Sequence, residues 1–78
     1  MKYTEKQIRE LYRIDNKYWK TGDIDFAKLA IEAARVIDQK YWDCVKNIAD
    51  FACRKHMPVQ TVIDALALFG YECEEEAE

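Results

Sequence analysis

The chain has 78 residues, of which half are apolar and 13% aromatic, and its net charge at pH 7 is −3. This composition predicts one small folded domain and argues against a disordered chain. No apolar run is long enough to cross a membrane, and the first residues lack the apolar stretch of a signal peptide. We therefore expect a cytoplasmic protein that does not contact membranes. Three loosely spaced cysteines, Cys44, Cys53 and Cys73, fit reduced thiols better than a disulfide framework.

The charges are unevenly distributed along the chain. Residues 1–20 carry a net charge of +3, residues 21–57 are neutral, and residues 58–78 carry −6 without any Lys or Arg. A chain with a basic front and an acidic rear can bind a second copy of itself or a charged partner.

The first predicted helix spans residues 5–20. Thr4 is a suitable N-cap, Gln7 completes a capping-box pattern, and Gly22 supplies the left-handed residue that ends the helix. Its apolar face predicts the following buried side chains: Ile8, Leu11, Tyr12, Tyr18 and Trp19.

Asp15 lies within that apolar face, four residues after Leu11. A buried carboxylate needs hydrogen-bond partners or must stay neutral, so we expect Asp15 to bond to a Tyr, Trp or Lys of another helix. No second acid or His stands beside it at helical spacing, so a catalytic pair is not indicated.

Basic side chains follow the opposite face of this helix at steps of three and four residues. They are Lys6, Arg9, Arg13 and Lys17, with Lys2 and Lys20 at the two ends. We call the first four the basic ridge. Such a ridge is either the solvated face of an amphipathic helix, which is the commoner case, or a surface for phosphates or an acidic partner.

Residues 24–57 contain neither Gly nor Pro, and their apolar residues recur at helical spacing after the capping residues Asp23 and Asp25. A single helix of this length would measure about 50 Å, which is too long for a compact domain of this size. The apolar stripe also rotates beyond residue 38. We therefore expect either one long helix kinked within residues 38–42 or two helices, over residues 24–39 and 41–56.

The last predicted helix, residues 58–69, starts at Pro58 and ends before Gly70. It is apolar on nearly every face, so we expect it to be central in the fold or covered by a second subunit. A homodimer is the commonest way to cover such a helix. The acidic residues 74–78 are predicted to form a disordered tail, which leaves residues 1–73 as one helical domain.

Groups that carry chemistry are sparse in this sequence. Cys53 and His56 have a metal-like C-x-x-H spacing, but Cys44 lies on the opposite side of a helix and Cys73 in the terminal segment. Four converging ligands for a structural zinc are therefore not indicated. The sequence also lacks a glycine-rich phosphate loop and a recognisable nucleophile–base pair. We expect no enzyme, no metal and no cofactor.

Residues 48–66 have the pattern of two helices that cross at a short turn. Ala52 is small enough for a close crossing, and Val62 and Leu66 are apolar positions of the second helix. On these residues the segment resembles the helix-turn-helix of lactose-repressor-type DNA-binding proteins, with His56 at the turn position that Gly usually holds. It is also similar to the small helical N-terminal module of bacterial translation initiation factor two. The first resemblance implies a DNA-binding regulator.

The resemblance to the lactose-repressor-type helix-turn-helix places several residues toward DNA. One of them has a side chain suited to reading a base. Gln60 can read a base by the usual pairings, whereas Asp64 repels phosphate. If nucleic acid binds, we expect the affinity to come from the basic ridge on the first helix.

The sequence therefore predicts an all-α fold, a compact bundle of three or four helices. The leading functional hypothesis is a small non-catalytic regulatory or adaptor protein that binds a macromolecular partner, with a protein partner favoured. One alternative is a DNA-binding helix-turn-helix regulator. The other is a small acidic inhibitor, such as a phage or mobile-element protein, that occupies a nucleic-acid-binding protein.

Overall fold

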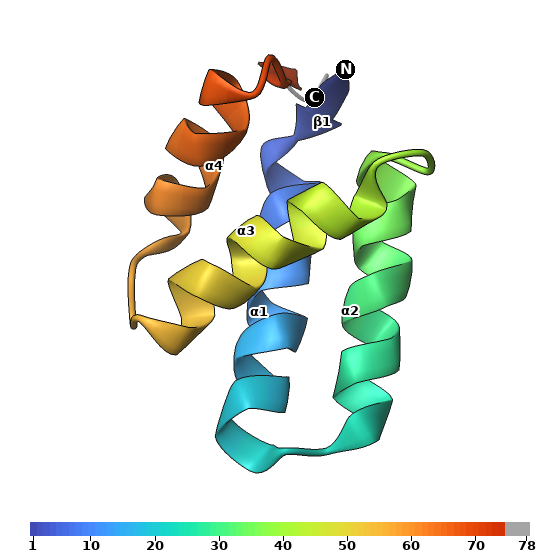
Figure 1. Cartoon of the computed structure of the whole chain (residues 1–78), viewed down its shortest axis with the longest axis vertical. Coiled ribbons are helices and arrows are strands. Elements are labelled where there is room, and N and C mark those ends of the chain that lie inside the picture. The colour runs from blue at the N-terminus through green and yellow to red at the C-terminus, as the bar shows by residue number, and fades with distance from the viewer. Residues whose placement is uncertain (75–78) are drawn as a thin grey trace.

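The computed structural model of the chain describes residues 1–74. Within them lie four helices and two short strands: β1 Lys2–Thr4, α1 Glu5–Thr21, α2 Ile24–Ile37, α3 Trp42–Arg54, α4 Val59–Leu68 and β2 Glu72–Glu74. Helices α1 and α2 lie side by side and antiparallel, α3 crosses α1, and α4 lies at one edge (Figure 1). The predicted all-α bundle is confirmed. None of these helices is long and apolar enough to cross a membrane.

Helix α1 begins and ends where the sequence predicts. The Thr4 hydroxyl accepts a hydrogen bond from the Gln7 backbone N–H at 3.2 Å, and the Gln7 side-chain oxygen accepts one from the Thr4 N–H at 2.9 Å. This reciprocal pair satisfies two N–H groups that have no partner inside the helix. At the other end Gly22 adopts a left-handed conformation with φ of 69°.

The buried face of α1 differs in part from the prediction. Ile8 and Leu11 are buried, as expected, but Trp19 is 42% exposed and Ile14 is buried in addition. Trp19 lies in the last turn of α1, where α3 presents charged rather than apolar side chains. Its indole N–H therefore donates a hydrogen bond to Asp50 on α3, at 3.3 Å.

The middle segment forms two helices and not one kinked helix. Helix α2 ends at Ile37 and α3 begins at Trp42, so the break falls inside the predicted window. The alternative of one long, kinked helix is wrong, because the helix ends at Ile37 and a new one begins at Trp42. Two separate helices can each turn an apolar face toward the core.

Asp38 fixes the break between α2 and α3. Its Oδ1 atom accepts hydrogen bonds from the backbone N–H groups of Lys40 and Tyr41 at 2.9 and 3.0 Å, and its Oδ2 atom accepts one from the Tyr71 hydroxyl at 2.6 Å. Burial raises the pKa of Asp38, but these three hydrogen bonds outweigh burial and hold the pKa below its ordinary value.

The turn between α3 and α4 contains a strained residue. His56 has φ of 56°, in the left-handed region that residues with a side chain rarely adopt. The Met57 N–H donates to the Ala52 carbonyl at 2.9 Å and the His56 N–H to the Cys53 carbonyl at 3.3 Å. These are the two bonds of a Schellman motif, whose left-handed position favours Gly.

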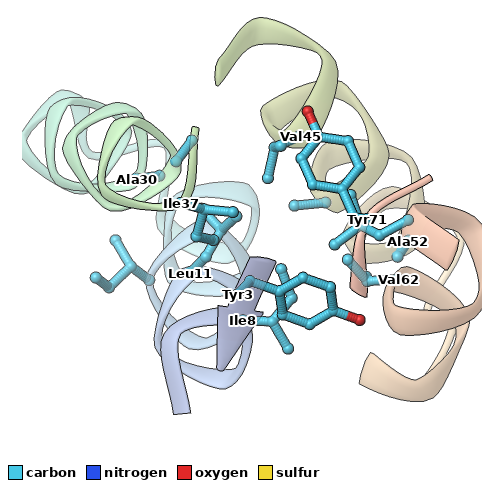
Figure 2. Close-up of a cluster of buried hydrophobic side chains, with 13 residues drawn as sticks. Tyr3, Ile8, Leu11, Ala30, Ile37, Val45, Ala52, Val62 and Tyr71 are labelled. Carbon is cyan, nitrogen blue, oxygen red and sulfur yellow. The ribbon is translucent and has the colours of Figure 1, made fainter. Parts of the chain in front are cut away.

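The core gathers side chains from all four helices and from both ends of the described chain (Figure 2). The buried apolar cluster consists of Tyr3, Ile8, Leu11, Ile14, Ala30, Ala34, Ile37, Val45, Ala49, Ala52, Val62, Leu66 and Tyr71. Its alanines come from α2 and α3, where small side chains let helices approach closely.

Helix α4 lies at the edge of the bundle, so the expectation that it is central is wrong (Figure 1). Val62 and Leu66 face α3 and α1 and are buried, whereas Leu68 is 88% and Phe69 65% exposed. A domain this small does not have enough chain to surround a fourth helix. Within residues 1–74 no element covers the outer face of α4.

A short parallel strand pair joins the two ends of the described chain, which the sequence did not predict. Strand β1 pairs with β2 so that Tyr3 lies opposite Cys73 and Thr4 opposite Glu74. Strands of three residues are too short for a periodic signal. Glu74, the first residue of the predicted tail, is thus part of a strand, and residues 75–78 lie outside the described residues.

The strain at His56 leads to a prediction about stability. His56→Gly removes the side chain that disfavours the left-handed conformation, so we expect it to raise the free energy of unfolding by about 1 kcal/mol. In a domain of this size the melting temperature then rises by about 4–8 °C. His56→Ala is the control, because it also removes the imidazole but keeps a Cβ atom. A glycine variant that melts at or below the wild type would contradict this account of the turn.

Candidate functional site

The four side chains of the basic ridge are all exposed on α1. Two of them are paired within the helix: Arg9 lies 2.6 Å from Glu5, and Arg13 lies 2.5 Å from Glu10. The hydrogen bond from Arg13 also lowers the pKa of Glu10. Because exposed carboxylates lie among its cations, the ridge attracts phosphates less strongly than its Lys and Arg content alone indicates.

The other two ridge residues, Lys6 and Lys17, lie on the same exposed face. The Lys17 ammonium lies 5.6 Å from the centre of the Phe26 ring on α2, a cation–π distance. The ridge is therefore one continuous face, but part of its charge serves the packing of α1 against α2.

The residues of the helix-turn-helix-like pattern divide between core and surface. Three of them are buried where α3 and α4 meet: Ala52, Val62 and Leu66. His56 and Gln60 are exposed, and the Gln60 amide donates a hydrogen bond to Asp64 at 3.0 Å. Helix α4 contains no Lys or Arg. Its exposed face thus offers no cation to a phosphate backbone.

An apolar groove lies between α3 and α4, with a volume of about 460 Å³. Its lining residues are Asp43, Cys44, Asn47, Ile48, Phe51, Thr61, Ala65 and Phe69. We call it the α3–α4 groove. These residues were not predicted as a site from the sequence, although Cys44, Ile48 and Phe51 recur at helical spacing.

The groove exists because α3 carries two apolar stripes. One stripe, Val45, Ala49 and Ala52, is buried in the core. The second stripe lies about a quarter turn round the helix, and there Ile48 is half-buried and Phe51 is 46% exposed. A helix in so small a domain can bury only one stripe fully, so the other is left as the wall of a groove.

Exposed apolar side chains continue from the groove onto the end of α4. Phe69 lines the groove and is 65% exposed, and its neighbour Leu68 is the most exposed large apolar residue described. Single exposed apolar residues are ordinary on a protein surface, whereas a cluster around a groove marks a binding site. This cluster is the best candidate for a functional surface.

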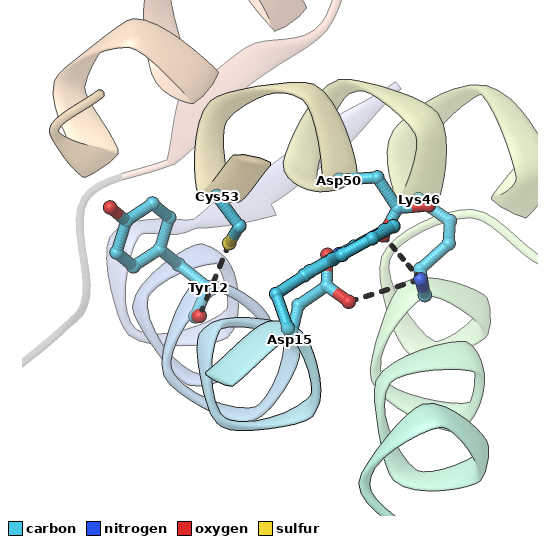
Figure 3. A network of polar contacts seen from close by, with 6 residues as sticks. Tyr12, Asp15, Lys46, Asp50 and Cys53 are labelled. Carbon is cyan, nitrogen blue, oxygen red and sulfur yellow. Dashed lines mark hydrogen bonds and ion pairs between the residues drawn. The ribbon is translucent and has the colours of Figure 1, made fainter. Parts of the chain in front are cut away.

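Asp15 is buried where α1 and α3 cross, and it meets Lys46 there. The Lys46 ammonium lies 3.1 Å from an Asp15 oxygen and 2.5 Å from an Asp50 oxygen, so one cation bridges two carboxylates (Figure 3). The expectation that Asp15 bonds to a side chain of another helix is confirmed. The network joins α1 to α3 at the core, where Asp15 is fully buried.

Asp15 is the carboxyl of this network whose pKa is raised. Burial raises the pKa of Asp15 to about 7, the Asp50 carboxyl adds to the rise, and Lys46 opposes it. Burial also raises the pKa of Asp50, but hydrogen bonds with Asp15, Lys46 and Trp19 lower it overall. With Asp15 neutral, the buried groups form one ion pair without excess charge, which is the least costly state in a core.

Cys53 and His56, the pair with the metal-like spacing, lie in different surroundings. The Cys53 thiol is buried and lies 3.8 Å from the Tyr12 carbonyl, and burial raises its pKa to about 12. A protonated thiol is a poor metal ligand and a poor nucleophile. His56 is exposed in the turn. Across residues 1–74 no three His, Cys, Asp or Glu side chains converge in a way that would hold a metal ion.

Comparison with known proteins gives no relative from which a function can be transferred. No family model, no curated protein and no solved structure matches this chain.

The raised pKa of Asp15 predicts how stability depends on pH. Because the folded state holds the Asp15 proton up to about pH 7 and the unfolded chain loses it near pH 4, the folded state binds more protons between these values. The free energy of unfolding should therefore fall by about 2–3 kcal/mol from pH 5 to pH 8. Asp15→Asn cannot ionise and should show a flatter profile, measured by urea denaturation. An equal slope in both proteins would contradict the assignment of the proton to Asp15.

Proposed function

We propose that this is a small non-catalytic adaptor or regulatory protein of the cytoplasm, and that it binds a protein partner through the α3–α4 groove. The observation that carries the proposal is the apolar groove with Phe51 and Phe69 on its walls and Leu68 at its edge. Aromatic side chains in a concave apolar surface are typical of the residues that dominate protein–protein binding energy.

The distribution of reactive groups supports a binding role over catalysis. The buried network of Asp15, Lys46 and Asp50 holds two helices together, and the Cys53 thiol stays protonated. The groove itself is lined by one ionisable carboxylate, Asp43, and by no His or Lys. A general acid and base within reach of one another are therefore not found along its walls.

A homodimer remains a prediction, and the same exposed end of α4 would be its interface. A two-fold contact there places two copies of α4 against each other, each with an exposed Asp64 and neither with a Lys or Arg to offset the repulsion. We therefore rank a different protein above a second copy as the partner. The inhibitor hypothesis is a special case of this proposal, in which the partner is a nucleic-acid-binding protein.

Binding of nucleic acid is the second candidate function. It is favoured by the short turn that brings α3 and α4 together at Ala52, Val62 and Leu66, and by the exposed basic ridge. It ranks lower because α4 lacks cations and because Arg9 and Arg13 already pair with carboxylates of α1.

Capture of a partner from lysate tests the first proposal. Phe69→Gln removes an aromatic wall of the groove, and Ile24→Gln is its matched control, because Ile24 is 62% exposed but lies on α2. Capture of a protein that the wild type and Ile24→Gln both bind should fall about tenfold or more on Phe69→Gln, since loss of an aromatic hot spot costs about 2 kcal/mol or more. Quantitative mass spectrometry measures the captured amounts.

Two outcomes of this experiment would contradict the proposal. Equal capture of the same proteins by both variants would place the binding surface elsewhere. Recovery of nucleic acid alone would favour the second candidate. Light scattering on the purified proteins at high micromolar concentration shows whether a second copy occupies the groove instead.

The second candidate has its own test. Arg9→Ala with Arg13→Ala should weaken binding to duplex DNA, and the remaining affinity should depend less steeply on salt, because fewer counterions are released. Gln60→Ala should have little effect, since that amide is already bonded to Asp64. Fluorescence anisotropy at several salt concentrations measures both. Loss of tight binding to one defined duplex on Gln60→Ala would instead support a helix-turn-helix regulator.

A further inference from the structure

The shape of the α3–α4 groove favours a helix as its occupant. The α3 wall carries Cys44, Ile48 and Phe51 at steps of four and three residues. The α4 wall carries Thr61, Ala65 and Phe69 at steps of four residues. Each wall thus extends over about two helical turns, or about 10–12 Å. Apolar ridges of this spacing accept the side-chain ridges of a third helix.

An extended peptide fits the same groove poorly. Both walls are helices, whose backbone N–H and C=O groups are already bonded within each helix. An extended chain in this groove would leave its own backbone groups without partners, whereas a helix satisfies them internally.

The charge around the groove specifies the flanks of that helix. Asp43 is the one ionised residue in the lining, and Asp64 is exposed on α4 one residue before Ala65. Asp43 and Asp64 form the acidic rim of the groove, and α4 contains no Lys or Arg. Glu72 lies in β2 opposite Lys2 and does not belong to this rim. The walls are joined at the turn and open toward Asp43 and Phe69, so Asp43 lies at the open end and Asp64 lies midway along α4.

A second copy of the chain does not supply a matching helix. The apolar side of α1 is buried, with Ile8 and Leu11 in the core. Its exposed basic ridge therefore has no apolar stripe beside it that could enter the groove. Helix α2 exposes Leu29 and Val36 on a face of mixed charge, where two exposed acids lie nearer to these side chains around the helix than the exposed cations Lys28 and Arg35 do. These acids are Asp25 and Glu32.

We propose that the α3–α4 groove binds an amphipathic helix of another protein, with apolar residues at i, i+3 or i+4, and i+7 and with Lys or Arg on its flanks. The inference rests on the proposed function and adds the chemical class of the partner. The apolar stripe covers the walls that Ile48, Phe51 and Phe69 form, and the cations face the acidic rim of Asp43 and Asp64.

Two synthetic helical peptides with the same leucine stripe test the inference, one with Lys and the other with Glu at the flanking positions. Each is titrated into the full ¹⁵N-labelled chain at low salt, and amide chemical shifts are followed. The Lys peptide should bind about tenfold or more tightly than the Glu peptide and should shift the amides of Ile48, Phe51 and Ala65. The difference should shrink at about 1 M salt, where the Debye length falls to about 3 Å.

A pair of charge variants links the preference to the rim. Asp43→Asn with Asp64→Asn should reduce the preference for the Lys peptide several-fold. Asp25→Asn with Glu32→Gln is the matched control, because it removes the same charge from α2 and should leave the preference unchanged. Circular dichroism confirms that both variants fold, and each substitution is nearly isosteric.

Several results would overturn the inference. They are equal or tighter binding of the Glu peptide, shifts confined to α1 and α2, and the absence of shifts in the groove with either peptide. The capture experiment with Phe69→Gln does not depend on the charge of the partner. Groove-dependent capture together with no preference between the peptides would therefore remove this inference and leave the proposed function standing.

Discussion

The carboxylate of Asp38 is the constraint on which the rest of the fold depends. Its hydrogen bonds to the N–H groups of Lys40 and Tyr41 end one helix and set the direction of the next. The same carboxylate accepts the Tyr71 hydroxyl, so the break between α2 and α3 is tied to the segment that follows α4. A buried, ionised Asp is costly unless it is fully bonded, and its three hydrogen bonds make this one tolerable. The direction of α3 follows, and with it the position of α4 and the groove.

The break and the helix caps were predictable because their signals are local. The capping box at Thr4, the stop at Gly22 and the rotation of the apolar stripe after residue 38 each depend on neighbours a few residues apart. The partner class of Asp15 was also predictable, since a carboxylate within an apolar face must find a donor. Its identity as Lys46 was not, because a contact between residues 31 apart depends on how two helices cross.

The groove was hidden from the sequence for a different reason. Periodicity shows that α3 has apolar residues around much of its surface, but it does not show which stripe the rest of the fold covers. Val45 and Ala49 are buried, whereas Phe51 is exposed, and that choice is made by α1 and α2. The strand pair of Tyr3 and Cys73 was hidden because three residues carry no period. The edge position of α4 depends on how much chain is left to cover it, which an apolar composition does not reveal.

Helix α3 explains how such a small domain can combine a rigid core with an exposed binding surface. One side of α3 carries Lys46 and Asp50, which are bonded to α1, and the side about half a turn away carries Ile48 and Phe51 in the groove. The apolar stripe between them fills the core. Because the polar network of Asp15, Lys46 and Asp50 holds one side of the helix, the other side can stay exposed without loss of order. The groove is then preorganised, and a partner that enters it does not bear the entropic cost of ordering α3.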